Sequence, residues 1–158
     1  MTERMVVVGA DAAGMSAASH IAGSYATFPG VVGTAVSKVY NLEIARTGLR
    51  ERDAAHAGFG YVTVTVRSGT RAAYFPGHPA PHRQDDRRTP HRAAAGAQIV
   101  GNEGSAKRID TAATALWNRM TVEEMTALDL AYALPFSPVW DPILVAARQA
   151  SAAVPAAP

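Results

Sequence analysis

Residues 61–67 (YVTVTVR) form the clearest strand signal in the chain. Their β-branched side chains favour extended backbone. Because successive side chains of a strand point to opposite faces of a sheet, the three valines share one face, and Tyr61, Thr63 and Thr65 share the other. This alternation predicts a strand with one apolar face.

Further strands and helices are predicted on both sides of this segment. Residues 31–46 alternate apolar with small or polar residues and predict one or two strands, and residues 97–101 predict a short apolar strand. Apolar spacing, a capping-box pattern and a helix-opening proline predict helices at residues 49–57, 105–120, 121–128 and 141–152. Together these elements predict an α+β fold, in which helices pack on a largely antiparallel sheet.

One interior segment does not fit this pattern. Residues 78–92 (HPAPHRQDDRRTPHR) contain four arginines, three histidines and three prolines, and no aliphatic residue larger than alanine. We therefore predict a loop rather than a strand. Such a loop would leave a thin sheet with unpaired edges, so marginal stability or aggregation is expected.

Composition limits the possible functions. The chain has 158 residues, no cysteine and a formal net charge of +2, which suits one modest globular domain. Without cysteine it cannot use a redox thiol, a thiolate ligand or a disulfide of its own. Its five histidines show no metal-ligand spacing, so no metal site is expected.

Charge and apolar patterning also limit the possible binding partners and the cellular compartment. The excess charge is small, and the arginines of residues 78–92 are not interleaved with aromatic residues, so no nucleic-acid partner is expected. No stretch approaches the roughly 20 apolar residues that span a bilayer, and residues 1–23 lack the layout of a signal peptide. We expect a cytoplasmic protein without a membrane partner.

The start of the chain carries a nucleotide-binding signal. A short apolar strand at residues 5–8 leads through a glycine-bounded turn into an alanine-rich helix. Glycine permits the sharp turn, and small residues let backbone N–H groups approach a phosphate, although an aspartate stands where a second glycine is usual. A plain strand–helix turn is the alternative. The turn comprises Gly9, Ala10, Asp11, Ala12, Ala13 and Gly14.

The second strand of a nucleotide-binding unit does not follow. Residues 23–30 (GSYATFPG) have turn chemistry where that strand would be expected. The unit therefore begins and is not completed.

Residues 5–19 (MVVVGADAAGMSAAS) resemble the start of the flavin domain of pyridine nucleotide-disulfide oxidoreductases, in particular coenzyme A-disulfide reductases and NADH oxidase-like enzymes. Residues 23–77 and 96–150 are similar to the C-terminal dimerisation domain of the same family. The stretches that carry this similarity are YATFPGVVGTAVSKV (25–39), LEIARTGL (42–49), GAQIVGNEGSAKRID (96–110) and ALDLAYALPFSPVWDP (127–142).

The resemblance implies that two separated pieces of a longer enzyme adjoin in this chain. Between these pieces, family members carry most of the flavin domain, the whole NAD(P)H domain and a redox cysteine. We therefore expect a truncated flavin-binding strand-turn-helix at residues 1–22, a dimerisation domain at 23–152 and a frayed tail at 153–158. FAD is the cofactor that the family implies, and we expect that it is not retained.

Residues 78–95 are the interior stretch that the resemblance does not cover. Their length fits the family spacing, but their Arg/Pro/His-rich content differs from the pair of strands that the family has there. A compensated frameshift would produce this combination. Reading the coding sequence in its other frames tests the hypothesis, and the lack of a family-like strand in every frame would refute it.

The resemblance also implies roles for individual residues. Tyr132 matches a tyrosine placed near the partner's flavin and bound thiol, and Tyr74 resembles a second tyrosine of that site, so both are candidate vestigial catalytic residues. Phe136, Trp140 and Pro142 match the dimer contact, where exposed aromatics suit an interface. The alternatives are amphipathic tyrosines at a sheet edge or interface, and internal packing of the other three residues.

Three functions remain open. The first is a non-catalytic dimerisation-domain remnant that pairs as a homodimer. The second is the FAD-dependent NAD(P)H oxidoreductase activity of the family, and the third is an interaction module that pairs with a full-length relative. A flavin needs a complete nucleotide fold to hold it, which favours the first. A yellow protein that oxidises NADH would contradict it.

Overall fold

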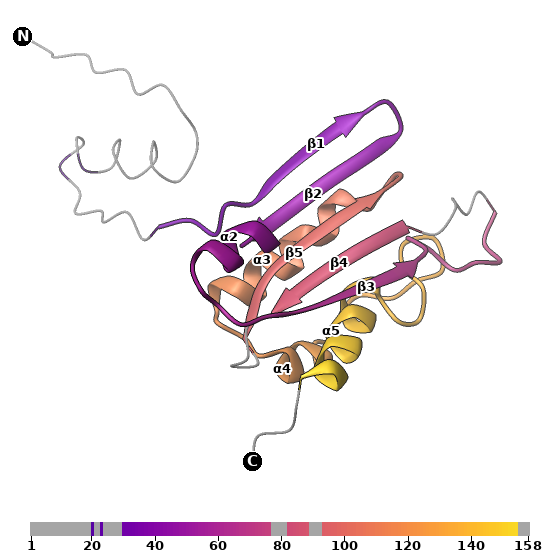
Figure 1. The fold of residues 1–158 in the computed structure, drawn as a ribbon. Helices are drawn as coiled ribbons and strands as arrows, with labels where there is room; N and C mark the ends of the chain where they lie inside the picture. The colour runs from indigo at the N-terminus through magenta and orange to yellow at the C-terminus, as the bar shows by residue number, and fades with distance from the viewer. Residues whose placement is uncertain (1–19, 21–22, 24–29, 77–81, 89–92, 155–158) are drawn as a thin grey trace, which may run out of the picture. The chain divides into compact units, whose positions relative to one another are not determined.

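The computed structural model describes residues 20, 23, 30–76, 82–88 and 93–154, with the backbone alone for residues 82–88. The chain divides into two units, Met1–Val31 and Val32–Pro158. The second unit carries the fold described below (Figure 1). The glycine turn predicted at residues 9–14 lies outside the described residues.

The second unit is a five-stranded sheet in which every neighbouring pair of strands is antiparallel. In space the strands follow the order β1-β2-β5-β4-β3 (Figure 1). Strands and helices together confirm the predicted α+β class. The strands are β1 (Ala35–Val39), β2 (Leu42–Gly48), β3 (Val62–Ser68), β4 (His82–Arg88) and β5 (Ala94–Gly101). The helices are α2 (Glu51–His56), the 3₁₀ turn η1 (Ala106–Arg108), α3 (Ile109–Trp117), α4 (Val122–Thr126) and α5 (Pro142–Ala153).

The prediction of a loop at residues 78–92 is wrong for His82–Arg88, because these residues form strand β4. This strand is paired along its length with β3 on one side and β5 on the other. A sheet ladder joins backbone N–H and C=O groups, so two flanking strands can hold a segment whose composition does not favour a strand. The predicted thin sheet is therefore wrong as well, because the sheet continues through β4 to β3.

Most other elements form where local chemistry predicted them. Residues 31–46 contain two strands, β1 and the larger part of β2, which meet at a tight turn where Tyr40 has a positive φ of 52°. The capping box of α4 is present: the Thr121 hydroxyl accepts a hydrogen bond from Glu124 N at 3.2 Å, and the Glu124 carboxylate accepts one from Thr121 N at 2.7 Å. The helix predicted at residues 105–120 is shorter, a 3₁₀ turn followed by α3.

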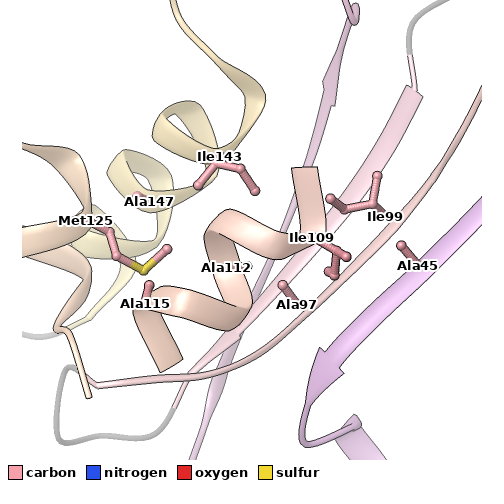
Figure 2. Packing of buried hydrophobic residues seen from close by; sticks show 9 residues of the cluster. All are labelled: Ala45, Ala97, Ile99, Ile109, Ala112, Ala115, Met125, Ile143 and Ala147. Atoms are coloured by element: carbon pink, nitrogen blue, oxygen red, sulfur yellow. The ribbon is translucent and has the colours of Figure 1, made fainter. Parts of the chain in front are cut away.

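One face of the sheet is covered by α3 and α5, and the core lies between them (Figure 2). Ala45, Ala97 and Ile99 stand on this face of the sheet, and Figure 2 shows them opposite buried side chains of the helices. The helical residues of this cluster are Ile109, Ala112, Ala115, Met125, Ile143 and Ala147. Because five of the nine residues of the whole cluster are alanines, helix and sheet can approach closely with few large side chains between them.

A glycine near the start of β5 lets the chain that leaves β2 pass close to this strand. Gly96 pairs with Gly48 of β2, and a Cβ atom at position 96 would lie 2.3 Å from the carbonyl oxygen of Leu49. No other residue fits this position without moving the backbone. The chain therefore turns from β2 toward α2 directly against β5, where Leu49 N donates to Ala95 O at 2.8 Å.

Candidate functional site

The two candidate tyrosines lie on segments that the fold brings together. Tyr74 follows β3, and Tyr132 lies between α4 and α5. A backbone hydrogen bond of 3.2 Å from Ala72 N to Leu134 O joins the two segments. Both tyrosine side chains are exposed, by 76% and 51%. They are therefore available to an external partner or ligand, in agreement with either interpretation of their role.

Arg108 fastens these segments to the end of the sheet. Its Nη2 donates to the carbonyl oxygens of Thr70 and Phe136, each at 2.8 Å, and its Nη1 donates to Gly104 O at 2.7 Å. Its Nε donates to the Asp141 carboxylate at 3.0 Å. The guanidinium group thus binds four acceptors from three different segments, which is the kind of planar, many-donor contact that arginine makes and lysine does not.

We call the pair of Arg108 and Asp141 the clamp. Asp141 also begins a helix. Its Oδ1 accepts from Ile143 N at 2.9 Å, which caps the N-terminus of α5. Its Oδ2 receives Arg108 and also the hydroxyl of Ser137 at 3.2 Å. The side chains of Arg108 and Asp141 are only 13% and 12% exposed, so the pair is largely desolvated and each charge needs the other.

The clamp leaves an apolar surface on the segment that it holds. We call residues 136–140 the aromatic loop. Within it, the exposed fractions are 77% for Phe136, 66% for Val139 and 51% for Trp140. The guanidinium carbon of Arg148 in α5 lies 3.5 Å from the centre of the Trp140 ring, a cation–π contact that fixes the indole while leaving half of it open. Exposed aromatic and branched side chains in one place are typical of a protein–protein contact.

The three residues predicted at the dimer contact do not share one environment. Phe136 and Trp140 are exposed, whereas Pro142 is buried at the first position of α5. There proline fits because its missing N–H would have no partner within the helix. Pro142 therefore belongs to the start of α5 and not to the exposed surface of the aromatic loop.

A second group of charges lies at the start of α2 and is satisfied internally. Arg50 donates to Asp53 from Nε at 2.7 Å and from Nη2 at 3.1 Å, and this side-chain hydrogen bond lowers the pKa of Asp53 to about 2. A cavity of about 500 Å³ lies beside this pair, with Tyr61 and Gln98 on its wall. Since Arg50 and Asp53 bind each other, we assign this pair a structural role at the start of α2 and not a catalytic one.

In the part of the chain that the structure describes, His, Asp and Glu side chains nowhere gather in the threes that would hold a metal ion. Within the same ranges, the helices lack the combined length and apolar character needed to cross a bilayer.

Sequence reasoning missed Arg108, on which the arrangement of the site depends. Asp141 stands before a proline, so its capping role could be predicted from local chemistry. Arg108 has no such signal, because Thr70 is 38 residues away and Phe136 is 28 residues away in the chain. Only the folded sheet brings these carbonyl groups to one guanidinium.

Comparison with known families supports the architecture. Residues 34–142 match the family described as pyridine nucleotide-disulphide oxidoreductase, dimerisation domain. The match begins one residue before β1 and ends at the first residue of α5, so it includes both the sheet and the aromatic loop.

Curated relatives and solved structures agree with this match. An NAD(P)H coenzyme A polysulfide/persulfide reductase of Pyrococcus horikoshii is 42% identical over 135 residues, which are 85% of this chain and 30% of that protein. A coenzyme A disulfide reductase of Staphylococcus haemolyticus is 34% identical over 110 residues, covering 70% of this chain and 24% of the relative. The structure of an NAD-dependent persulfide reductase from A. fulgidus superposes with a TM-score of 0.84 at 38% identity, over 89% of this chain and 26% of that one. The chain thus spans about a third or less of the length of these proteins.

Proposed function

The chain belongs to the pyridine nucleotide-disulphide oxidoreductase family through its dimerisation domain, and from this premise we propose that its folded unit is a homodimerising module that catalyses nothing by itself. The observation that carries the proposal is the aromatic loop. Phe136, Val139 and Trp140 are exposed on a segment held in place by the clamp of Arg108 and Asp141. A rigid, exposed apolar surface loses little conformational entropy when it binds, which favours association.

The non-catalytic part of the proposal is supported by what the chain contains. It has no cysteine, so a redox thiol is absent from the whole sequence. All strand pairs of the described unit are antiparallel, whereas a dinucleotide cofactor is held at the ends of a parallel, doubly wound sheet. The described residues therefore do not by themselves fit FAD, and we assign no reaction step to them.

The candidate site residues keep the roles that the family implies, as part of this proposal. Tyr74 and Tyr132 would face a partner's cofactor site and have no substrate of their own. Gly9 to Gly14 would be the remainder of a flavin-binding turn, in a segment of residues 1–22 that precedes the dimerisation domain at residues 23–152. A chain without cysteine is compatible with the reducing cytosol, which is where we place the module.

The first experiment measures the mass of the protein by sedimentation over a range of concentrations. The wild-type chain should sediment as a dimer. Replacing both aromatic residues (Phe136→Ser with Trp140→Ser) should give a monomer, because the apolar surface is lost. Tyr40→Ser is the matched control, since Tyr40 is a 94% exposed aromatic residue at the turn between β1 and β2.

Either of two results would count against pairing through the aromatic loop. One is a monomeric wild-type chain, and the other is an equal loss of mass in the double variant and in Tyr40→Ser. Co-purification with a longer relative, combined with a monomeric chain on its own, would instead favour a module that pairs with such a relative.

The second experiment tests the absence of catalysis. The purified protein should be colourless, and adding FAD and NADH should cause no oxidation of NADH above the rate without protein. Visible flavin absorption that survives gel filtration, together with NADH oxidation, would show the family's oxidoreductase activity in this chain.

A further inference from the structure

A cavity of about 350 Å³ lies beside the clamp and shares Phe136 with the aromatic loop. Its wall includes Thr70, Arg71, Glu103, Arg108 and Phe136. The volume falls in the lower part of the range of small-molecule sites in proteins. Its lining joins charged groups with the apolar ring of Phe136, which is also typical of such sites.

The two arginines of this cavity differ in their bonding. Arg108 already donates to three carbonyl oxygens and one carboxylate. For Arg71, by contrast, no ion pair or hydrogen bond joins its side chain to the rest of the described chain, and its Nε is buried without a partner. The Arg71 side chain as a whole is only partly buried and lines the cavity, so the donors of its guanidinium other than Nε are available to a ligand there.

Thr70, the residue before Arg71, also lines this cavity and is held by the fold. The residue is 5% exposed, and its hydroxyl oxygen is buried without a hydrogen-bond partner. The backbone carbonyl of Thr70 is bound by Arg108, which holds the residue in position. Thr70 thus fixes the backbone next to Arg71, whose guanidinium is the kind of planar donor that binds oxyanions.

We propose that this cavity binds the oxyanion group, a phosphate or a carboxylate, of a small organic molecule. Arg71 supplies the positive charge and a planar pair of donors, and the ring of Phe136 contacts the apolar part of the ligand. Glu103 is the carboxylate on the same cavity and weakens the binding of an anion. The cavity belongs to one chain, so binding does not require the pairing proposed above.

The probe is inorganic phosphate, titrated into the purified full chain by calorimetry, with acetate as the second arm. Wild-type protein should bind with a dissociation constant on the order of 1 mM and in a saturable manner. Arg71→Gln should weaken binding at least about tenfold. Arg67→Gln is the matched control, because Arg67 is an exposed arginine on β3 and carries the same change of charge. Comparing phosphate with acetate identifies which oxyanion the cavity prefers.

Glu103→Gln keeps the test decisive if Arg71→Gln does not fold. Removing this exposed carboxylate should tighten phosphate binding several-fold, since the repulsion of the anion is removed. Saturable binding that is lost in Arg71→Gln, kept in Arg67→Gln and tightened in Glu103→Gln supports the site. The proposal is overturned by the absence of saturable binding, by equal weakening in the two arginine variants, or by unchanged affinity in Glu103→Gln. The sedimentation of the same samples reports on pairing separately.

Discussion

Arg108 shows how one side chain can hold a functional surface that it does not itself form. Its guanidinium joins the carbonyl groups of Thr70 and Phe136 to the carboxylate of Asp141. We predict that Arg108→Met lowers the free energy of unfolding by about 3 kcal/mol, because it leaves Asp141 as a buried charge without its partner. Chemical denaturation monitored by tryptophan fluorescence measures this loss.

The neighbouring lysine provides the control for this change. Lys107 forms an ion pair with Asp110 in which the lysine side chain is largely exposed. Lys107→Met should therefore change the free energy of unfolding by less than about 1 kcal/mol. Equal effects of the two substitutions would mean that the clamp does not hold the aromatic loop in solution.

Asp53 connects the stability of the fold to pH. Hydrogen bonds from Arg50 lower the folded-state pKa of Asp53 to about 2, below the value of about 3.9 for an unfolded chain. The contribution of the pair is therefore present above about pH 4 and is lost as the pH falls toward 2. Asp53→Asn should lower the melting temperature at pH 6, and the difference from wild type should shrink as the pH falls toward 2 and vanish below it.

The control for this titration is Asp129→Asn. Asp129 is exposed and forms no ion pair with any residue in the ranges that the structure describes. Its replacement should leave the melting curve at pH 6 unchanged. If the difference between wild type and Asp53→Asn persisted undiminished at pH 2, the pairing with Arg50 would not be its cause.

At the scale of elements, β4 is the part of the sheet that its own residues support least. Its register places Gln84 directly opposite Ile99 of β5 and Val66 of β3, and both of these residues are buried. We predict that Gln84→Val raises the free energy of unfolding by about 1 kcal/mol, or the melting temperature by about 3 °C, since valine suits a strand between apolar neighbours.

Gln98→Val on β5 is the matched control, the same change one strand away. Gln98 stands opposite Arg46 and Asp85 rather than buried apolar residues. It should not be stabilised by valine. If both substitutions had the same effect on thermal unfolding, the register of β4 would not explain the gain.

The elements that could be predicted from the sequence are those whose causes lie within a few residues. The alternation of residues 61–67 predicted β3, and the Thr121–Glu124 capping box and the Asp141–Pro142 pair predicted where two helices begin. β4 could not be predicted this way, because its strand conformation comes from two neighbours in the sheet. The length of residues 78–95 was the available signal, since it fitted a pair of strands where composition did not.

The candidate site was predictable to a similar extent. Resemblance to a family identified Phe136 and Trp140, which are exposed, and also Pro142, which is buried within the chain. The clamp at Arg108 and the unsatisfied donors of Thr70 and Arg71 depend on which segments meet at the end of the sheet. That information arises only from the long-range pairing of strands.

At the scale of the whole molecule, pairing and stability should be linked. If the native state is a dimer, mass action makes its melting temperature depend on protein concentration. We predict a rise of about 2–3 °C for each tenfold increase in concentration, measured by differential scanning calorimetry. The Phe136→Ser, Trp140→Ser variant should melt at one temperature throughout the range. A wild-type melting temperature that does not change with protein concentration would indicate that the unit folds as a monomer.

The strand order β1-β2-β5-β4-β3 also has a consequence in time. β2 cannot complete its pairing until β5 has been synthesised, since Glu43 of β2 pairs with Gly101 at the end of β5. A ribosome adds about 5–20 residues per second, so the hairpin of β1 and β2 emerges several seconds before its neighbour. During that interval β2 is paired with β1 on one edge, and the edge that later pairs with β5 has no strand beside it. We expect the yield of folded protein in a cell to depend on how long this edge stays unpaired. Slower translation of the region between β2 and β5 should therefore lower the yield.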